Sequence, residues 1–563
     1  MNRGIVAALL GFMLLSQTGS AEGRIEQFFS ENNALLREDY LNAQDALEVG
    51  PEGFARHVLE YDGAGHVIRE TFLDDQLLPV ANKDGVITLE REYNEQGQVT
   101  RIRYLDAEGN PMPNHKLGAY GEAFEYDEAG NVSVITRLDA GGGPMIGAGG
   151  WARVEYACDE NGRRVMETCY NAVGVPCLNT GGWCRVKRQY DEAGNAVWEV
   201  YFDADLNPAP NSSGIIAILR SFNENGKVTR AMYFDGNGAP MLYARIGACG
   251  EAFEYDEAGN TIVNTRLDAD AHPMIGANGW ATVKNGFNEK KQKISERYFS
   301  ADGEPCLMNN SYWGVDLDYD AAGNVIRETY YDLSGSVGAN GDGIIITEKS
   351  YNKAGKVAFQ RFLDAGGNPM PVGGRYQIAM EYDGRNHLTR ETNLDTDFNR
   401  ILGAEGWCQH DITPDEHNWR LTERYSDTNG MPVLRNGDYS GIDRAFNESG
   451  RVIRETFHDA TGDIGPNKAG IIVRETDYDN AGRIVELRYY DGMGAPMIPA
   501  GIGAHIERRA YDEAGNLNYT GYFDAGGDPM KGPEGWAWAQ YEYDEANQRI
   551  AERYYDEVGE AVS

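Results

Sequence analysis

The sequence predicts an all-β fold, an elongated array of sixteen β-hairpin repeats of about 32 residues that forms a solenoid or a spiralling sheet. Three observations predict it. An aromatic residue followed by Asp or Asn recurs at steps of 31 to 33 residues. A second Asp or Asn follows the first at a fixed distance, and Gly-rich turns bound segments rich in β-branched and aromatic residues. The 563 residues are therefore expected to form one repeat array rather than several globular domains.

The repeat register is marked by sixteen positions, which are aromatic in all copies but two. These positions are Tyr61, Tyr93, Tyr126, Cys158, Tyr190, Phe222, Tyr255, Phe287, Tyr319, Tyr351, Tyr382, Pro414, Phe446, Tyr478, Tyr511 and Tyr543. The next residue is Asp or Asn in every copy, and twelve residues later a second Asp or Asn follows, with Ser300 as the exception. Because this step never varies, each unit joins a rigid hairpin to a loop of variable length.

The first turn of each unit has its clearest form at residues 126–131, Tyr-Asp-Glu-Ala-Gly-Asn. Asp at the start and Gly three residues on predict a type I turn closed by a left-handed residue, with the Asp side chain bonding the turn's N–H groups. The left-handed position holds Gly in twelve copies, and Asn386, Asn418, Asn547 or Lys291 in the others. Gly and Asn tolerate positive φ best, so Lys291 is the one violation.

A second turn has the pattern Asp-Ala-x-Gly-x-Pro-Met. Gly109 and Pro111 are examples of its glycine and proline. Proline has no N–H to give to a sheet, so the strand is expected to end here and a loop to begin.

A longer period groups the repeats into four modules of four. Gly150-Trp151, Gly279-Trp280, Gly406-Trp407 and Gly535-Trp536 recur at 127 to 129 residues, which is four units. Duplication of a four-unit ancestor explains this period, and so does a superhelical turn completed by four hairpins. The two explanations are compatible.

The N-terminal 52 residues lack the repeat. Residues 1–21 have a positive start, an apolar run and small residues suited to cleavage after Ala21, which predicts a signal peptide; an uncleaved membrane anchor is the alternative. In residues 22–52, Ile25, Phe28, Phe29 and Leu35 follow a helical face, which predicts a short helical N-terminal cap on the array at 53–563. The expected location is secreted, cell-surface or periplasmic.

The net charge limits the classes of partner that the chain can bind, and the cysteine content limits its disulfides. The net charge of −37 disfavours nucleic acid and anionic membrane surfaces, which carry the same sign. No later segment is apolar enough to cross a membrane. The seven Cys are an odd number, and four lie between Cys158 and Cys184, where one local disulfide is compatible with an oxidising compartment.

At residues 126–131 and 319–324, Tyr-Asp-Glu-Ala-Gly-Asn and Tyr-Asp-Ala-Ala-Gly-Asn, the chain resembles the YD repeats of Rhs-type proteins, and the resemblance covers residues 53–563. It implies secreted or extracellular β-structures, which in that family include shells that enclose toxins and are in some cases linked with carbohydrate binding. The unit here is longer, and no toxin or self-cleaving core follows the array. Residues 522–530 with Gly535-Trp536 also resemble choline-binding and clostridial-toxin cell-wall repeats, although most units lack the Gly-Trp step.

The candidate ligand contacts are tryptophans, since flat aromatic faces suit sugar rings and quaternary ammonium groups. They are Trp151, Trp183, Trp280, Trp407 and Trp536. The alternative is that these rings pack between hairpins. The turns at 203–205 and 268–270, Asp-Ala-Asp, resemble parts of calcium-binding loops and suggest calcium as a ligand. Turn capping is a sufficient explanation for a turn with a single Asp.

No catalytic apparatus is recognisable. The nine His are scattered without a metal-ligand spacing, and sixteen equivalent carboxylates favour a structural role. The sequence therefore predicts a non-enzymatic scaffold, without a required cofactor, that binds glycans or cell-wall polymers, or other surface proteins. The alternative is a purely structural spacer or shell protein with no ligand of its own.

Overall fold

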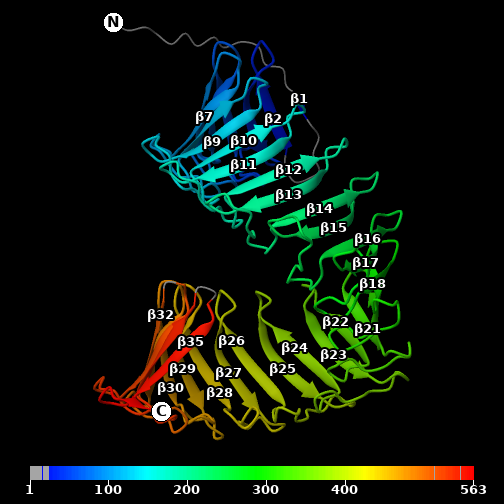
Figure 1. Cartoon of the computed structure of the whole chain (residues 1–563), viewed down its shortest axis with the longest axis vertical. Coiled ribbons are helices and arrows are strands. Elements are labelled where there is room, and N and C mark those ends of the chain that lie inside the picture. The colour runs from blue at the N-terminus through cyan, green and yellow to red at the C-terminus, as the bar shows by residue number, and fades with distance from the viewer. Residues whose placement is uncertain (1–14, 17–23, 513, 545–546, 563) are drawn as a thin grey trace. The chain divides into compact units, whose positions relative to one another are not determined.

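The computed structural model describes residues 15–16, 24–512, 514–544 and 547–562, and every regular element in these ranges is a β-strand (Figure 1). The chain divides into two compact units. Unit 1 contains residues 1–283 and 300–304, and unit 2 contains residues 284–299 and 305–563. Strand β18 (Thr282–Phe287) contributes its first residues to unit 1 and the rest to unit 2. No helix in the described ranges is long and apolar enough to cross a membrane.

The other strands of unit 1 are β1 (Leu15–Ser16), β2 (Arg24–Phe29), β3 (Leu35–Leu41), β4 (Arg56–Tyr61), β5 (Val67–Leu73), β6 (Thr88–Tyr93), β7 (Val99–Leu105), β8 (Gly121–Tyr126), β9 (Val132–Leu138), β10 (Arg153–Cys158), β11 (Arg164–Tyr170), β12 (Arg185–Tyr190), β13 (Ala196–Phe202), β14 (Ala217–Phe222), β15 (Val228–Phe234), β16 (Gly250–Tyr255) and β17 (Thr261–Leu267).

The other strands of unit 2 are β19 (Lys293–Phe299), β20 (Gly314–Tyr319), β21 (Val325–Tyr331), β22 (Ile346–Tyr351), β23 (Val357–Leu363), β24 (Gln377–Tyr382), β25 (Leu388–Leu394), β26 (Gln409–Pro414), β27 (Arg420–Ser426), β28 (Gly441–Phe446), β29 (Val452–His458), β30 (Val473–Tyr478), β31 (Ile484–Tyr490), β32 (Ile506–Tyr511), β33 (Leu517–Phe523), β34 (Trp538–Tyr543), β35 (Arg549–Tyr555) and β36 (Ala561–Val562).

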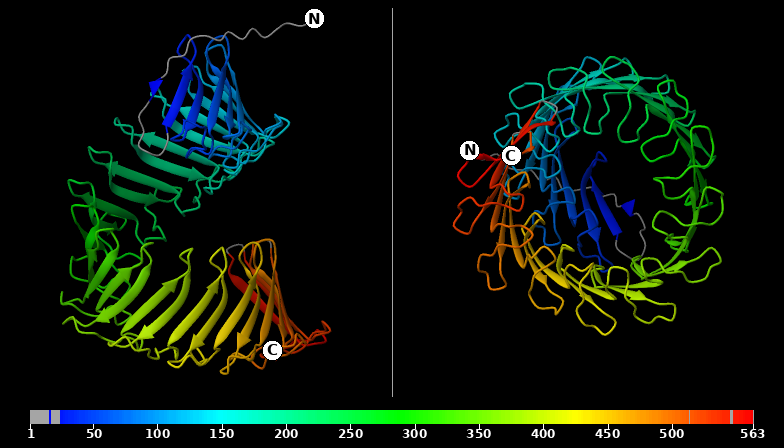
Figure 2. Two further views of the ribbon diagram at one scale, coloured as in Figure 1. Left: turned by 180° about the vertical axis from the view of Figure 1, so that it is seen from behind. Right: turned by 60° about the horizontal axis from the view of Figure 1, so that its bottom comes forward.

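Within each unit the strands form an antiparallel meander, in which neighbours in sequence are neighbours in the sheet. In unit 1, β4 pairs with β3 on one side and with β5 on the other. In unit 2, β28 pairs with β27 and β29 in the same way. Figure 2 lets the reader follow this order within each unit, with the loops leaving the strands along the sheet edges. The predicted all-β hairpin array is confirmed.

The first turn of each hairpin has the predicted geometry. Asp62 is representative: its Oδ1 accepts the N–H groups of Ala64 at 2.8 Å and His66 at 2.9 Å. Gly65 closes the turn with φ 90°, and the strand register shifts between Glu60 and Tyr61, which is a β-bulge. The residues that replace glycine adopt the same left-handed backbone, with φ 61° at Lys291, 64° at Asn386, 65° at Asn418 and 60° at Asn547.

At eleven of the sixteen register positions, a tyrosine binds its hairpin to the one before it. Every one of these tyrosine hydroxyls donates a hydrogen bond to the carbonyl oxygen of the first residue in the second strand of the preceding hairpin. The bonds join Tyr61 to Leu35, Tyr93 to Val67, Tyr126 to Val99, Tyr190 to Arg164, Tyr255 to Val228, Tyr319 to Lys293, Tyr351 to Val325, Tyr382 to Val357, Tyr478 to Val452, Tyr511 to Ile484 and Tyr543 to Leu517, at 2.6–3.0 Å. We call this bond the tyrosine lock.

Removing one tyrosine lock is expected to weaken the contact between two hairpins. In Tyr319→Phe the ring remains but the Lys293 carbonyl loses its donor, at a cost of about 1 kcal/mol in local stability. Hydrogen–deuterium exchange should show faster exchange in β19–β21. The control is Tyr156→Phe, because the half-buried Tyr156 hydroxyl has no hydrogen bond with another described residue. Equal exchange in Tyr319→Phe and the unmodified protein would show that the lock adds nothing to stability.

The second turn is tighter than the sequence predicts. Its glycines have the expected positive φ, for example 85° at Gly109. Pro111 does not begin an open loop, however, because it lies in a β-bridge opposite Leu105, the last residue of β7. The next residue, Met112, donates its N–H to the carbonyl of Tyr104 at 2.9 Å. Proline can hold this place because the following residue supplies the donor.

The hydrophobic core of each unit lies between one face of its sheet and the loops. In unit 1, Phe72 and Tyr104 from strands pack with Phe54 and Val86 from loops. A second cluster in unit 1 contains Ile218, Ala231, Tyr233 and Tyr243. The main cluster of unit 2 contains Ile442, Phe457, Ile471, Leu487 and Tyr489. The loops therefore take the part of a second layer over the sheet.

The predicted helical cap at residues 22–52 is wrong, since this segment forms another hairpin, β2–β3. Its turns follow the repeat with different residues. Ser30 accepts the N–H of Ala34 at 3.0 Å in the first turn, and Asn33 closes that turn with φ 62°. Asn42 caps the second turn, twelve residues after Ser30. Serine in place of Asp conceals the register, and the apolar residues that suggest a helix alternate in two paired strands instead.

The described part of the chain therefore begins its hairpins at Arg24 and contains seventeen of them. The predicted signal peptide, residues 1–21, falls outside the described residues apart from Leu15–Ser16, which form the short strand β1 paired with β2.

Candidate functional site

The five predicted tryptophans lie at the ends of loops, each just before a strand. Trp280, Trp407 and Trp536 are buried, with 6%, 4% and 8% exposure, whereas Trp151 and Trp183 are half-buried. In each case the next residue is small and fully buried. These small residues are Ala152, Cys184, Ala281, Cys408 and Ala537, all with 0% exposure. The Gly-Trp step thus positions a loop against the sheet, which is the packing role named as the alternative.

Most of the tryptophan ring faces are covered by neighbouring side chains. The Arg137 guanidinium lies 4.7 Å from the centroid of Trp151, and that of Arg266 lies 4.5 Å from Trp280. Trp536 packs between Tyr522 and Tyr554, with centroids at 5.0 and 5.5 Å. Stacking on a sugar needs an open ring face, so a ligand contact at any of these rings stays a prediction, with half-buried Trp151 and Trp183 the least enclosed.

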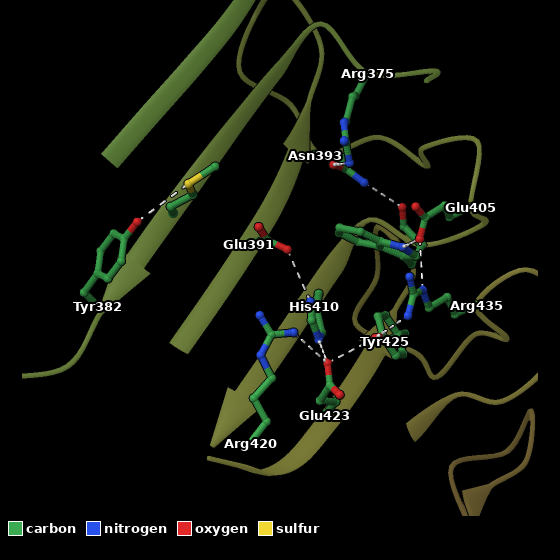
Figure 3. A network of polar contacts seen from close by, with 12 residues as sticks. Arg375, Tyr382, Glu391, Asn393, Glu405, His410, Arg420, Glu423, Tyr425 and Arg435 are labelled. Atoms are coloured by element: carbon green, nitrogen blue, oxygen red, sulfur yellow. Dashed lines mark hydrogen bonds and ion pairs between the residues drawn. The ribbon is translucent and has the colours of Figure 1, made fainter. Parts of the chain in front are cut away.

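Trp407 donates its Nε1–H to Glu405 at 3.1 Å, and Glu405 belongs to the network of polar contacts in unit 2 that Figure 3 shows. At its centre His410 from β26 is held between two glutamates. Its Nε2 lies 2.8 Å from Glu423 of β27, and its Nδ1 lies 3.3 Å from Glu391 of β25. The His410 ring stacks on Tyr425 with centroids 4.5 Å apart, and Trp407 packs edge-on against it.

The charges in this network stabilise one another. Burial disfavours the His410 imidazolium, but the hydrogen bonds to Glu391 and Glu423 outweigh burial and raise the pKa of His410. Burial also acts against the Glu423 carboxylate, yet His410 and Arg444 together hold its pKa well below the usual range. Both ring nitrogens of His410 are engaged, so the network has the character of a structural ion cluster.

All seven cysteines are free thiols, including the four between Cys158 and Cys184 that were candidates for a local disulfide. Cys169, Cys184 and Cys408 are buried. Burial raises the pKa of the Cys169 thiol to about 12, so this side chain is neutral. Cys184 and Cys408 occupy the position after the Gly-Trp step that holds alanine at Ala152, Ala281 and Ala537.

In the acidic turns the aspartate carboxylates accept hydrogen bonds from backbone N–H groups. Asp268 Oδ1 accepts the N–H groups of Asp270 at 2.9 Å and His272 at 2.8 Å, as the turn-capping interpretation predicts. In the described ranges, no three His, Cys, Asp or Glu side chains are grouped so that they could hold a metal ion. Calcium binding stays a prediction.

A cavity of about 350 Å³ lies in unit 1, on the face of the sheet opposite the core. Strand alternation places Arg101 and Arg103 of β7 on this face, because Ile102 between them packs against the core cluster. Arg69 of β5 and Glu90 of β6 complete the charged wall. The apolar wall consists of Leu105, Pro111, Tyr120 and Leu138. We call this space the arginine cavity.

Two glycines line the arginine cavity at positions where a side chain would not fit. Gly121 begins β8, and a Cβ added there would overlap the carbonyl oxygen of Ile102. The turn at 139–142 closes the cavity on the other side, and a Cβ added at Gly142, which has φ 85°, would overlap the Arg101 guanidinium. The second turn of this hairpin therefore rests against Arg101.

The arginines of the cavity are weakly paired. Arg69 approaches Glu90 at 3.4 Å and Arg103 approaches it at 3.5 Å, longer than an ordinary charged hydrogen bond. Arg103 also reaches Glu92 at 3.2 Å. Arg101 forms no ion pair with any described residue, and its Nε is buried without a hydrogen-bond partner. A buried donor without a partner favours an acceptor from outside the chain.

The arginine cavity departs from the repeat. Residues 121–131 recur at 250–260, yet the residues equivalent to Arg69 and Glu90 are Trp198 and Leu219. In place of Arg103 stands Met232, whose side chain covers Gly250. Arg69, Glu90 and Arg103 do have counterparts in unit 2, at Arg327–Glu348–Arg361 and at Arg454–Glu475–Arg488. Their combination with Arg101 does not recur there, because Phe359 and Glu486 hold the position of Arg101. The alternating arginines of residues 99–105, followed by Gly-Glu-Ala, are the sequence signal that could have revealed it.

The fold defines this chain as a β-hairpin repeat protein. No family model matches it, and no curated protein matches it. Solved structures that it resembles include a crystal structure of TcdB2-TccC3-TEV, with 13% identity and a TM-score of 0.33 over 95% of this chain and 30% of that chain. Another is TcdB2-TccC3, with 11% identity and a TM-score of 0.34 over 96% of this chain and 27% of that chain. The chain spans less than a third of the length of these chains. At these values the relation to Rhs-type proteins stays a prediction.

Proposed function

We propose that this chain is an exported, non-catalytic β-hairpin scaffold that binds glycans or cell-wall polymers at the cell surface, in the periplasm or outside the cell. The observation that carries the proposal is the arginine cavity, in which Arg101 adds a guanidinium without an ion pair among the described residues to an Arg–Glu–Arg set that recurs in the array. Small-molecule sites of folded proteins are concave and combine apolar surface with precisely placed polar groups, and this cavity has one charged and one apolar wall.

The proposed role as a scaffold rests on the tyrosine lock and on the caps of the turns. Both recur along the chain with the same geometry, and the tyrosine lock joins neighbouring hairpins at eleven of the sixteen register positions. A purely structural spacer or shell is the second candidate, and this regularity also favours it. The network at His410 supports the non-catalytic part, because both of its ring nitrogens are engaged by carboxylates.

A panel of glycans and cell-wall polymers tests the proposed function. We expect the purified protein to bind at least one polymer of the panel, with the same affinity in calcium and in chelator. Trp151→Ala, which changes a half-buried ring, should leave the fold intact and report whether this predicted contact takes part. Failure to bind any polymer under either condition would leave the structural spacer as the function.

A further inference from the structure

We propose that the arginine cavity of unit 1 recognises the carboxylate of an acidic sugar, a hexuronic acid residue within a polysaccharide. This inference deepens the proposed function and rests on it. It also identifies a binding position away from the five tryptophans.

The arginines of the cavity favour a negatively charged ligand. Arg69, Arg101 and Arg103 gather in one cavity of a chain with a net charge of −37. The guanidinium of Arg101 has no carboxylate partner among the described residues, and its Nε lies buried and unbonded. Arginine presents its N–H groups as a planar fork that matches carboxylate geometry. An anionic oxygen ligand would therefore satisfy a donor that the protein leaves open.

The second step is the amount of charge. Glu90 and Asp139 line the same cavity, and Glu92 pairs with Arg103 at 3.2 Å, so Arg69 and Arg103 each have a carboxylate neighbour. Arg101 has no ion pair with a described residue. A single carboxylate neutralises the charge of Arg101, whereas a phosphate dianion exceeds it and would lie near these carboxylates. The balance favours a monoanion.

The third step is the remainder of the ligand. Glu90 and Asp139 are acceptors that sugar hydroxyls can satisfy, and Asp139 uses Oδ1 for the N–H of Gly143 at 2.8 Å while forming no ion pair with described residues. Leu105, Pro111 and Tyr120 offer apolar surface to the C–H groups of a ring. A volume of about 350 Å³ is at the small end of ligand sites, which suits one sugar residue. Arg103, with its side chain 49% exposed, keeps the cavity open to solvent for the rest of the polymer.

The test compares two equivalent arginines by calorimetric titration with a hexuronic acid trisaccharide. Arg101→Gln is expected to weaken binding by about 10- to 100-fold, because a charge-assisted hydrogen bond is lost. Arg230→Gln is the matched control: Arg230 holds the same position in β15, 129 residues on, where Leu219 and Met232 stand in place of Glu90 and Arg103. It should bind like the unmodified protein. Equal affinities of the two variants overturn the inference.

A second variant and two further ligands separate the remaining explanations. Arg103→Met installs the residue found at the equivalent position of β15, and we expect it to weaken binding with an unchanged unfolding midpoint. The same trisaccharide with its carboxyls reduced to alcohols should bind at least about tenfold more weakly. Inorganic phosphate that binds as tightly as the trisaccharide would overturn the assignment to a sugar acid.

The experiments distinguish a failure of the proposed function from a failure of the ligand assigned to the arginine cavity. If no polymer of the panel binds, the proposed function fails and this inference fails with it. If polymers bind but neither Arg101→Gln nor reduction of the carboxyls matters, the proposed function stands and the assignment of the arginine cavity is wrong.

Discussion

Replacing Glu423 by alanine is expected to lower the stability of the hairpins around it by about 4 kcal/mol. The Glu423 carboxylate accepts from His410 at 2.8 Å and from Arg420 at 3.3 Å, and it also pairs with Arg444. Its side chain is 6% exposed, so water does not replace these contacts when it is removed. The variant leaves a buried imidazole and a largely buried guanidinium without their main anion, which costs more than the lost attraction itself.

The matched control is Glu328→Ala. Glu328 holds the same strand position in β21, but it is more exposed and pairs with Lys349 at 2.9 Å. Its loss should cost only about 0.5–1 kcal/mol. Urea unfolding followed by tryptophan fluorescence measures both variants. Similar midpoints for the two would contradict the role of Glu423 as the centre of the network.

The effect of Glu423→Ala is also expected to depend on pH. The raised pKa of His410 gives a stability contribution that is complete below pH 6.5 and is lost as the pH rises through the folded-state value. The lowered pKa of Glu423 gives one that is complete above pH 4.5 and is lost as the pH falls through its folded-state value. The difference between the unmodified protein and the variant should therefore be largest between pH 4.5 and pH 6.5 and should shrink as the pH rises above or falls below this range.

Replacing Phe457 by alanine is expected to destabilise the core of unit 2 by about 4 kcal/mol. Phe457 is 5% exposed and belongs to the main cluster with Ile442 and Tyr489. Its ring also meets Tyr439 edge-on with centroids 5.5 Å apart. The loss has two parts, the transfer of the ring out of the core and the cavity that the surrounding side chains fill only in part.

Phe398→Ala is the control for this prediction. Phe398 lies in a second turn with φ 66° and is 64% exposed, stacked on Phe359 at 5.7 Å. Its removal should cost less than about 1 kcal/mol, because little area leaves the core. Thermal unfolding distinguishes the variants. A midpoint of Phe457→Ala that matches that of Phe398→Ala would show that the loops do not form a packed layer.

The hairpins could be predicted because local chemistry determines their turns. Positive φ at Asn386 and Asn418 follows from the residue types that tolerate it, and the aspartate caps follow from the fixed spacing. The hairpin at 24–41 was missed because Ser30 and Asn42 perform the same capping with other side chains. A search for Asp alone misses this hairpin, whereas a search for any side chain that can accept the turn's N–H groups would find it.

The candidate site was harder to predict, since it depends on contacts between strands. The sequence identifies the tryptophans by type, but whether a ring is open or covered depends on Arg137 and Arg266, each from the strand before it. The arginine cavity requires Arg69, Arg101 and the turn at 139–142 to meet on one face. Register across three hairpins sets that meeting, and no single motif encodes it.

The tyrosine locks can form in the order in which the hairpins are synthesised. Each hydroxyl reaches back to a carbonyl that is earlier in the chain by 25 to 27 residues, as Tyr382 does to Val357 and Tyr511 to Ile484. During synthesis, a hairpin that leaves the ribosome thus finds its acceptor already in place on the hairpin before it. Domains synthesised from the N-terminus fold in that order, and this array needs no later residue to complete an earlier lock. Each tyrosine lock can therefore form as soon as its own hairpin has been synthesised.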